Sequence, residues 1–366
     1  MYKEQNHHYN VKIDRCSMEK TYLDILKPDD WHVHLREGEI LSHVLPFTYN
    51  NFGSALVMPN LDNPVTNISL AETYYAEICR QIPKGIKFTP HMTLYLTNYL
   101  NKDEIKRVSN HQYIKAIKMY PKGATTNSNS GISNVVEFYP LFEAMEKNGV
   151  ILSIHGEVTD ENVDVFEREK VFIERVLTKV INNFPNLRIV LEHITSADAV
   201  RFIKKHKNIA ATITNHHLMV NRNIMLSKGI RPDFYCAPIL KTEHDRLALV
   251  QAAISGNCKF FLGTDSAPHV NSKKISACGC AGIFSSPLAI PLLIQLFEEH
   301  GSLSEIEKFI STNGRDFYGM KQQEERVQYI KRSKSINTIK DIETIEGKIT
   351  VFNPCNNLYW EKANEV

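Results

Sequence analysis

The sequence reads DDWHVHLREG from residue 29 to residue 38, in an apolar, strand-like run that begins near Asp24. In an extended strand, residues two positions apart point to the same face. His32 and His34 therefore direct their imidazoles to one side, as a pair of metal ligands must, and Arg36 follows if the strand continues. A single His-x-His occurs by chance in many chains with 15 histidines among 366 residues, so its weight depends on the residues further along the chain.

Short β-rich runs alternate with longer amphipathic stretches, which is the pattern of βα units around a parallel sheet. The expected strands are Asp24–Leu35, Ser54–Met58, Lys87–Tyr95, Tyr113–Met119, Val150–His155, Arg188–His193, Ile209–Thr214 and Lys259–Gly263. The expected helices include Leu70–Arg80, Val136–Lys147, Asp164–Asn182, Ala197–Lys205 and Glu243–Ser255. Eight strands with intervening helices predict a (β/α)8 TIM barrel. The alternative is an open doubly wound sheet, which needs a glycine-rich phosphate turn after the first strand, and the sequence has none there.

Composition and charge set the class of protein. Charged residues make up 23% and hydrophobic residues 43%, as in globular proteins, and the net charge of +2 suggests neither a nucleic acid nor a membrane surface as partner. The longest apolar run, Leu288–Phe297, is too short to cross a bilayer. We expect residues 1–20 to be a loosely ordered arm and residues 21–366 to form a single barrel domain with a C-terminal extension. The extension begins after Asn313 and includes a late strand at Lys348–Phe352.

The seven cysteines are scattered, and the only close pair is Cys278 and Cys280. A Cys-x-Cys without a second pair is poor support for a structural zinc site. Residues 1–20 also lack the apolar stretch of a secretory signal. We therefore expect reduced thiols and a cytoplasmic protein.

Residues with metal-binding side chains follow the expected strands where those strands end. In a barrel the carboxyl ends of the strands form the active site. A single histidine there is usually structural, but four histidines and an aspartate on one rim favour a metal centre. Nitrogen and carboxylate ligands suit zinc, with manganese, iron and cobalt as alternatives. The candidates are His32, His34, Asn60, Lys118, His155, His193 and Asp265.

Lys118 requires its own explanation, because an ammonium group beside a dication is repelled. Burial and nearby positive charge lower the pKa of a lysine, and the neutral amine can react with carbon dioxide. The resulting carbamate is an anion with two oxygens that can bridge two metal ions. The simpler interpretation is that Lys115 and Lys118 are surface lysines.

Eight blocks of sequence together resemble the dihydroorotases of the bacterial single-domain type, in the amidohydrolase superfamily. The resemblance extends from about Leu23 to Tyr318 and leaves the N-terminal arm outside. The blocks are DDWHVHLREG, VMPNL, IKMYPKGATTNSNSGI, HGEV, LEHIT, NHHLMVNRN, CAPILK and FLGTDSAPH.

The resemblance implies an amidohydrolase-type barrel with two zinc ions per subunit. His32, His34 and Asp265 would hold the first ion, and His155 and His193 the second. Lys118, carboxylated to N6-carboxylysine, would bridge both. The residues that match substrate contacts are Arg36, Asn60 and His269 for the α-carboxylate, Ala237 and Ala281 for the ring, and Thr125 and Thr126 on a loop that closes over the substrate.

The implied reaction is the reversible cyclisation of N-carbamoyl-L-aspartate to L-dihydroorotate with release of water, in de novo pyrimidine biosynthesis. Asp265 would be the catalytic acid and base as well as a ligand, although a role as ligand alone is the alternative. The resemblance also implies a homodimer. Two other functions stay open: a hydantoinase or dihydropyrimidinase with the same metal ligands, and a catalytically inactive barrel that acts as a scaffold.

Several other polar residues receive no catalytic role. His216 and His217 follow the seventh strand, and we expect them to be structural. Glu157 and Glu192 flank ligand histidines, and we expect them to point away from the site and to hydrogen-bond behind the ligands or in the core. The sequence assigns no chemistry to His91 or Thr93.

Overall fold

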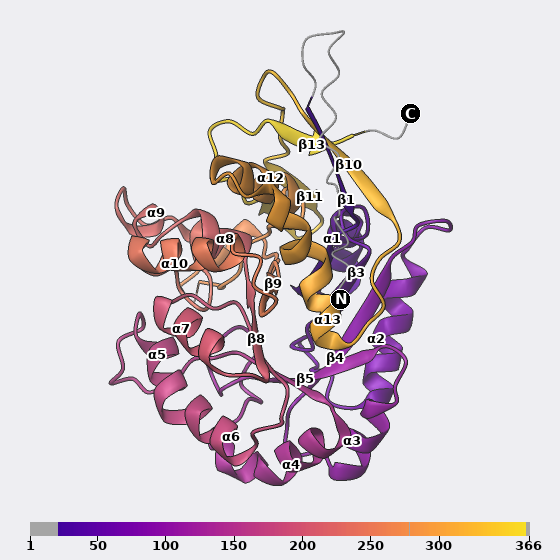
Figure 1. Ribbon diagram of the computed structural model, residues 1–366, viewed down its shortest axis with the longest axis vertical. Coiled ribbons are helices and arrows are strands. Elements are labelled where there is room, and N and C mark those ends of the chain that lie inside the picture. Colours follow the sequence, from indigo (N-terminus) through magenta and orange to yellow (C-terminus); the bar gives the residue numbers. More distant parts are fainter. Residues whose placement is uncertain (1–20, 278, 364–366) are drawn as a thin grey trace, which may run out of the picture.

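The computed structural model describes residues 21–277 and 279–363, so the predicted arm at residues 1–20 lies outside the described part of the chain. Eight parallel strands follow one another around a single sheet, and helices cover its outer face (Figure 1). The (β/α)8 barrel predicted from the sequence is confirmed. The strands are β2 (Asp29–Val33), β3 (Ser54–Val57), β4 (Thr89–Tyr95), β5 (Ile114–Met119), β6 (Ile151–Ile154), β7 (Ile189–Leu191), β8 (Ile209–Ile213) and β9 (Phe260–Leu262).

The helices between the strands begin where polar caps satisfy their first backbone N–H groups. Asn67 caps α2, Asn101 caps α3 and Ser196 caps α7, while Thr242 and Asp245 form a capping box at α10. The α-helices are α1 (Gly38–Tyr49), α2 (Ile68–Arg80), α3 (Lys102–Ser109), α4 (Tyr139–Asn148), α5 (Arg168–Phe172), α6 (Thr178–Asn183), α7 (Ala197–Lys205), α8 (Asn215–Met219), α9 (Asn223–Leu226), α10 (Glu243–Ala253), α11 (Asn271–Lys274), α12 (Ala289–Glu299) and α13 (Asn313–Tyr318). Shorter 3-10 and π turns are η1 (Val135–Phe138), η2 (Ile173–Leu177), η3 (Pro232–Phe234), η4 (Leu303–Glu305) and η5 (Lys308–Thr312).

The single strand expected at Asp24–Leu35 was wrong, because the structure divides it between two sheets. β1 (Thr21–Leu26) leaves the barrel and pairs antiparallel with β10 (Arg326–Lys331), which also pairs with β13 (Trp360–Lys362). The break falls at Lys27 and Pro28. Proline has no N–H to donate to a ladder, so it ends one strand and lets the chain turn into the next. In Figure 1, β1, β10 and β13 lie together at the top of the molecule.

Other elements also differ from their expected bounds, and the helix expected at Val136–Lys147 is divided between η1 and α4. The helix expected from Asp164 begins at Arg168 and continues through the π turn η2 into α6. The late strand at Lys348–Phe352 appears as β12 (Gly347–Thr350), which forms a two-stranded sheet with β11 (Asp341–Thr344).

α13 covers the amino end of the barrel, opposite the strand ends that carry the candidate ligands. The Trp31 ring stacks on Tyr318 with centroids 4.4 Å apart. The Arg315 guanidinium pairs with the buried carboxylate of Asp29. Gly314 is required for this approach, because a Cβ there would lie 1.9 Å from the Trp31 Nε1.

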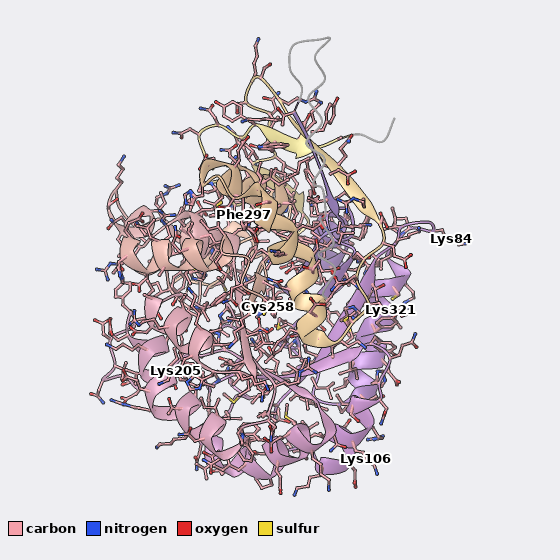
Figure 2. All side chains as sticks on the ribbon, viewed as in Figure 1. Lys84, Lys106, Lys205, Cys258, Phe297 and Lys321 are labelled. Atoms are coloured by element: carbon pink, nitrogen blue, oxygen red, sulfur yellow. The ribbon has the colours of Figure 1, made fainter. Side chains whose placement is uncertain are left out.

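The barrel interior is filled by apolar side chains that the strands direct inward, including Leu56, Ala116, Val190 and Phe261. A larger apolar layer fills the space between the sheet and the helices. Figure 2 shows Phe297 of α12 within the side-chain mass, whereas Lys84, Lys106 and Lys205 extend from the periphery. Among the described residues, no helix is both long enough and apolar enough to cross a membrane.

Candidate metal centre at the carboxyl ends of the strands

His32, His34 and Asp265 meet where the first and last barrel strands come together. The His34 Nε2 lies 3.3 Å from the His32 Nε2 and 3.0 Å from an Asp265 carboxylate oxygen. The His32 Nε2 lies 3.4 Å from the same oxygen. Burial lowers the pKa of His34 to about 4, so the ring is neutral. Two imidazoles and a carboxylate at this spacing are a donor set that can hold one divalent cation.

Lys118 ends its strand inside the barrel and is fully buried. Its Nζ has no hydrogen-bond partner, and burial lowers its pKa to about 8. An unpaired buried amine is costly for a folded protein, so this position calls for a partner or a modification. Conversion of the amine to a carbamate would replace the buried cation by an anion among metal ligands.

His155 and His193 form the other half of the cluster. Their ring centroids are 4.8 Å apart, and the His193 ring lies 5.0 Å from the His32 ring. The His193 Nδ1 is buried without a partner, and the His155 Nε2 is hydrogen-bonded to Glu157. The Glu157 contact leaves the Nδ1 of His155 for a metal ion, and His193 offers a ring nitrogen without a hydrogen-bond partner.

The structure thus brings the six predicted ligands to one mouth of the barrel. Their side chains are at least nine-tenths buried, which removes the competing water that weakens electrostatic binding. Burial alone would raise the pKa of Asp265, but the hydrogen bond from His34 and the nearby histidines hold it well below its usual range. An ionised carboxylate beside several imidazole nitrogens is a suitable donor set for a divalent cation.

Backbone strain is concentrated at the same residues. Within residues 21–277 and 279–363, four residues other than glycine have positive φ: Arg36 at 62°, Asn127 at 55°, His193 at 40° and Asp265 at 45°. Left-handed backbone is unfavourable for residues with a Cβ and is often found at functional sites. Three of these four residues are candidates that the sequence had already singled out.

Glu192 links the ligands to the barrel interior. Its carboxylate accepts hydrogen bonds from the His32 Nδ1 at 2.9 Å, the Ser153 hydroxyl at 2.6 Å and the Thr212 hydroxyl at 2.6 Å. A carboxylate on the far nitrogen of a ligand histidine fixes the ring and its tautomer. The sequence-based expectation that Glu157 and Glu192 hydrogen-bond behind the ligands agrees with these contacts. The expected direction of Glu192 was wrong, because it turns inward beneath His32.

A small inner pocket of about 20 Å³ lies directly over the candidate ligands. It opens near an outer cleft of about 260 Å³, and Arg36, Asn60 and Thr126 line both spaces. His269 lines the outer cleft. The other predicted contact residues that line the inner pocket are Thr125, Ala237 and Ala281.

Arg36 and His269 form a polar corner between the two spaces. The Arg36 Nε donates to the Pro268 carbonyl at 3.0 Å, and an Arg36 terminal nitrogen lies 3.0 Å from the His269 Nε2. Burial holds the pKa of His269 well below its ordinary value, so this ring is neutral and the guanidinium supplies the positive charge. The Asn60 Oδ1 is buried without a partner nearby. This corner can bind a carboxylate.

The glycine- and serine-rich segment at residues 121–133 folds over the inner pocket. The Asn60 side chain donates to the Thr126 carbonyl at 3.1 Å. The Asn127 side chain donates to the Asn60 carbonyl and to Asp62. Side-chain amide hydrogen bonds therefore tie the tip of this segment to the loop after β3.

Tyr120 was missed by the sequence reasoning. It lines the inner pocket, is 1% exposed, and has no partner for its hydroxyl. Its position two residues after Lys118 was the available signal, because residues two apart in a strand share a face. Gly282 also lines the pocket and gave no such signal.

A parallel eight-stranded barrel with histidine, aspartate and lysine at its carboxyl ends defines a class of hydrolases, and a family comparison names that class. The family model described as "Amidohydrolase family" matches residues 29–331. The chain belongs to the amidohydrolase family, and within it to the dihydroorotases. It is 46% identical to a dihydroorotase of Rhizobium rhizogenes over 340 residues, which cover 93% of this chain and 98% of the relative. It is 50% identical to a dihydroorotase of Methylobacillus flagellatus over 308 residues, which cover 84% of this chain and 89% of the relative.

Solved structures agree with this assignment. A dihydroorotase from Campylobacter jejuni superposes with a TM-score of 0.86 at 31% identity and covers 96% of this chain and 100% of its own. A dihydroorotase from Saccharomyces cerevisiae, in complex with 5-fluoroorotic acid, superposes with a TM-score of 0.84 at 34% identity. The match covers 93% of this chain and 98% of the yeast chain. An L-hydantoinase from Arthrobacter aurescens superposes with a TM-score of 0.74 at 13% identity, and this similarity shows only that the fold is shared.

Proposed function

We propose that this chain is a zinc dihydroorotase that interconverts N-carbamoyl-L-aspartate and L-dihydroorotate in de novo pyrimidine biosynthesis. The observation that carries the proposal is the buried Lys118 amine, which lies over the Tyr120 ring and has no hydrogen-bond partner, among five side chains with metal-binding donor atoms. A structural lysine would be paired, whereas a carboxylated lysine explains both its burial and its position. Two related expectations from the sequence, a homodimer and a cytoplasmic location, belong to the same proposal.

The residues present fit two zinc ions bridged by a carboxylated lysine. His32, His34 and Asp265 would hold one ion, and His155 and His193 the other, with Lys118 between them. When bound, the ions would polarise the ring amide carbonyl and lower the pKa of a water molecule.

Arg36, Asn60 and His269 would bind the α-carboxylate of the substrate. The planar guanidinium of Arg36 can donate two parallel hydrogen bonds to this group. Its position between the inner pocket and the outer cleft would hold the ring over the ligands. Backbone groups at Ala237 and Ala281 line the same pocket and can contact the ring amides.

Asp265 would move the proton. In ring opening its ionised carboxylate accepts a proton from the attacking water and donates it to the ring nitrogen as the C–N bond breaks. In ring closure it takes a proton from the carbamoyl nitrogen and donates it to the hydroxyl oxygen of the protonated side-chain carboxyl group of the substrate, which leaves as water. Thr125 and Thr126, on the segment that folds over the inner pocket, would exclude bulk water during these steps.

The competing candidates are a cyclic amidase for neutral rings and an inactive scaffold. Purified enzyme should open dihydroorotate far faster than dihydrouracil, because dihydrouracil has no carboxylate for Arg36. A preference for dihydrouracil would overturn the substrate assignment. No turnover of either ring by zinc-loaded protein would support the scaffold.

A further inference from the structure

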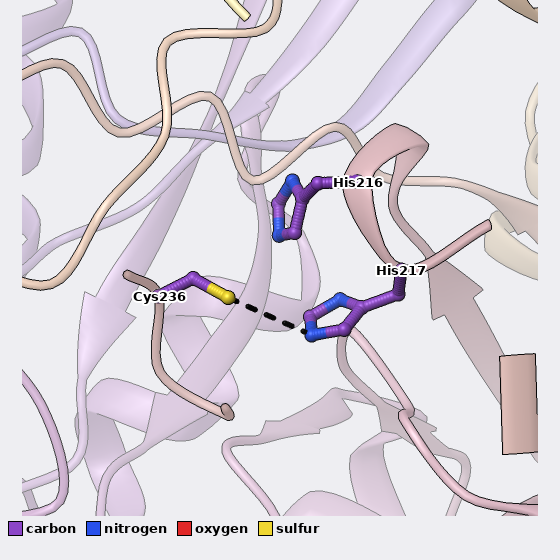
Figure 3. Close-up of side chains that lie close together, drawn as sticks. All are labelled: His216, His217 and Cys236. Carbon is purple, nitrogen blue, oxygen red and sulfur yellow. Dashed lines mark hydrogen bonds between the residues drawn. The ribbon is translucent and has the colours of Figure 1, made fainter. Parts of the chain in front are cut away.

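A second group of metal-binding side chains lies behind the inner pocket. His216 and His217 begin α8, and Cys236 precedes the pocket residue Ala237. All three side chains are buried, with exposed fractions of 0%, 2% and 1%. Figure 3 shows the two rings and the thiol turned toward one another.

The spacing of this group resembles the edges of a tetrahedral metal site. The Cys236 Sγ lies 3.8 Å from the His217 Nε2. The Pro238 carbonyl oxygen lies 3.0 Å from that nitrogen and 3.2 Å from the sulfur. Zinc–nitrogen and zinc–sulfur bonds of about 2.0–2.3 Å at tetrahedral angles give ligand separations of about 3.3–3.6 Å. One ligand atom from each of His216, His217 and Cys236 lies within 4.8 Å of the other two.

The buried ring of His216 lacks hydrogen-bond partners, and this observation is independent of the spacing of the three side chains. Neither of its ring nitrogens has a hydrogen-bond partner, although the side chain is completely buried. A neutral imidazole has one donor and one acceptor, and leaving both unsatisfied away from water is costly. In Figure 3 one nitrogen of this ring points toward Cys236 and His217. A bound ion would satisfy that nitrogen.

The charge states of the group suit a cation. Burial lowers the pKa of His216 to about 4 and holds that of His217 well below its ordinary value, so both rings are neutral. Burial raises the pKa of the Cys236 thiol to about 12. A thiolate can therefore form there only with a cation beside it.

We propose that His216, His217 and Cys236 bind one zinc ion, separate from the ions at the six-residue centre. Binding would displace the thiol proton to solvent. The His217 proton would move from Nε2 to Nδ1, where the Thr214 hydroxyl oxygen 2.8 Å away can accept it. The Pro238 carbonyl oxygen, freed from both hydrogen bonds, lies in reach as an oxygen ligand. From the sequence the histidine pair was expected to be structural and not to bind a metal ion, so this proposal departs from that expectation.

The site would act on the active pocket through Ala237. This residue lies between Cys236 and Pro238, and both neighbours contribute atoms to the group. An ion bound there would fix the backbone groups that Ala237 presents to the inner pocket. The role is positioning, because Ala237 lines the inner pocket whereas His216, His217 and Cys236 are not among its lining residues.

Cobalt(II) titration separates this site from the other centre. The six-residue centre contains only nitrogen and oxygen donors, so a thiolate-to-cobalt charge-transfer band in the near ultraviolet reports a cysteine ligand. We expect the full-length enzyme to develop this band at one equivalent per chain. Cys236→Ser should abolish it, and the exposed Cys258→Ser should retain it. Absence of the band in the unsubstituted enzyme, or its persistence in Cys236→Ser, overturns the proposal.

A second variant covers the case in which Cys236→Ser does not fold. His216→Gln leaves the thiol and the hydrogen bonds of His217 in place. This substitution should weaken the binding of cobalt, measured by the intensity of this band, at least ten-fold. Elemental analysis should find one zinc ion fewer per chain than in the unsubstituted enzyme. An unchanged affinity and zinc content in His216→Gln would exclude the site.

Discussion

The backbone amide of Asp265 donates a hydrogen bond to the carbonyl of His32 at 2.8 Å. The amide of His34 donates in turn to the Ser266 carbonyl at 3.0 Å. These contacts join the end of β9 to β2, so the bonds that close the barrel also set the carboxylate beside the histidine pair. Asp30 strengthens the join, because its carboxylate accepts hydrogen bonds from the Thr264 amide and hydroxyl.

Asp265→Ala should abolish turnover and weaken metal binding, since the same carboxylate is proposed as ligand and proton carrier. Loss of general acid–base catalysis alone predicts a fall in kcat of about 10²–10⁴-fold. Steady-state assays with dihydroorotate and elemental analysis of zinc measure the two effects, with Asp103→Ala on the exposed face of α3 as control. Near-normal activity in Asp265→Ala would rule out the double role.

Lys118→Ala should remove the bridging ligand and with it most of the bound metal and activity. Because the substitution leaves a cavity, a short carboxylate such as propionate should restore part of the activity by taking the place of the carbamate. The matched control is Lys115→Ala on the same strand, whose Nζ bonds to the Gln112 carbonyl instead. If propionate restores nothing while zinc content stays normal, Lys118 is not a metal ligand.

Arg36→Met should chiefly raise the KM for dihydroorotate. Loss of charge-assisted hydrogen bonds worth about 1.5–3 kcal/mol corresponds to roughly 10–100-fold weaker binding. Zinc content should not change, and the slow reaction with dihydrouracil should be unaffected because that ring has no carboxylate. Loss of zinc in this variant would show that Arg36 supports the metal centre.

Glu192→Gln should lower metal affinity by about 10–100-fold, because the amide can no longer accept from all three of its donors. Glu169 offers a matched control, as another fully buried carboxylate that accepts hydrogen bonds from Thr195 and Ser196. Glu169→Gln should reduce the free energy of unfolding without changing zinc affinity in a chelator competition assay. Equal losses of affinity in both variants would contradict a specific role for Glu192.

His91→Phe should make the protein less sensitive to acid. Burial lowers the pKa of His91 to about 3, and neither ring nitrogen has a partner. The folded state therefore binds fewer protons than the unfolded state, and stability present above about pH 6.5 is lost as the pH falls.

Between pH 7 and pH 5 the His91 contribution is about 2 kcal/mol. Urea unfolding at both pH values should show this loss in the unsubstituted protein and in the exposed His300→Gln control. The phenylalanine ring can keep the stacking on Trp31, and a cavity of about 570 Å³ beside the site leaves room for it. An unchanged pH dependence in His91→Phe would contradict the assignment.

The barrel was predictable from sequence because each strand is a short apolar run between amphipathic helices. The break at Pro28 was not recognised, because the apolar pattern continues across it while the hydrogen-bond partner changes from β10 to β3. The pairing of β1 (Thr21–Leu26) with β10 (Arg326–Lys331) joins segments far apart in the sequence, and no local pattern encodes such a contact. The stacking of Tyr318 on Trp31 could not be predicted either, because these residues are also far apart in the sequence.

The candidate site was predictable as a set of residues, because ligand types at successive strand ends converge in any closed barrel. The direction of Glu192 was not, since it depends on where the strand ends and the loop turns after Leu191. The approach of Cys236 to His217 and the contact of Asn60 with Thr126 join separate loops. Loop conformations of this kind are set by tertiary packing, which sequence patterns do not report.

The closure at His32 and Asp265 also sets an order of events during synthesis. The histidine pair leaves the ribosome long before the carboxylate that completes its donor set, and β9 is the last barrel strand to be translated. A nascent chain that ends after β8 has no closing strand and lacks the Asp265 carboxylate beside His32 and His34. The donor set around the histidine pair is therefore complete only once translation has passed Asp265.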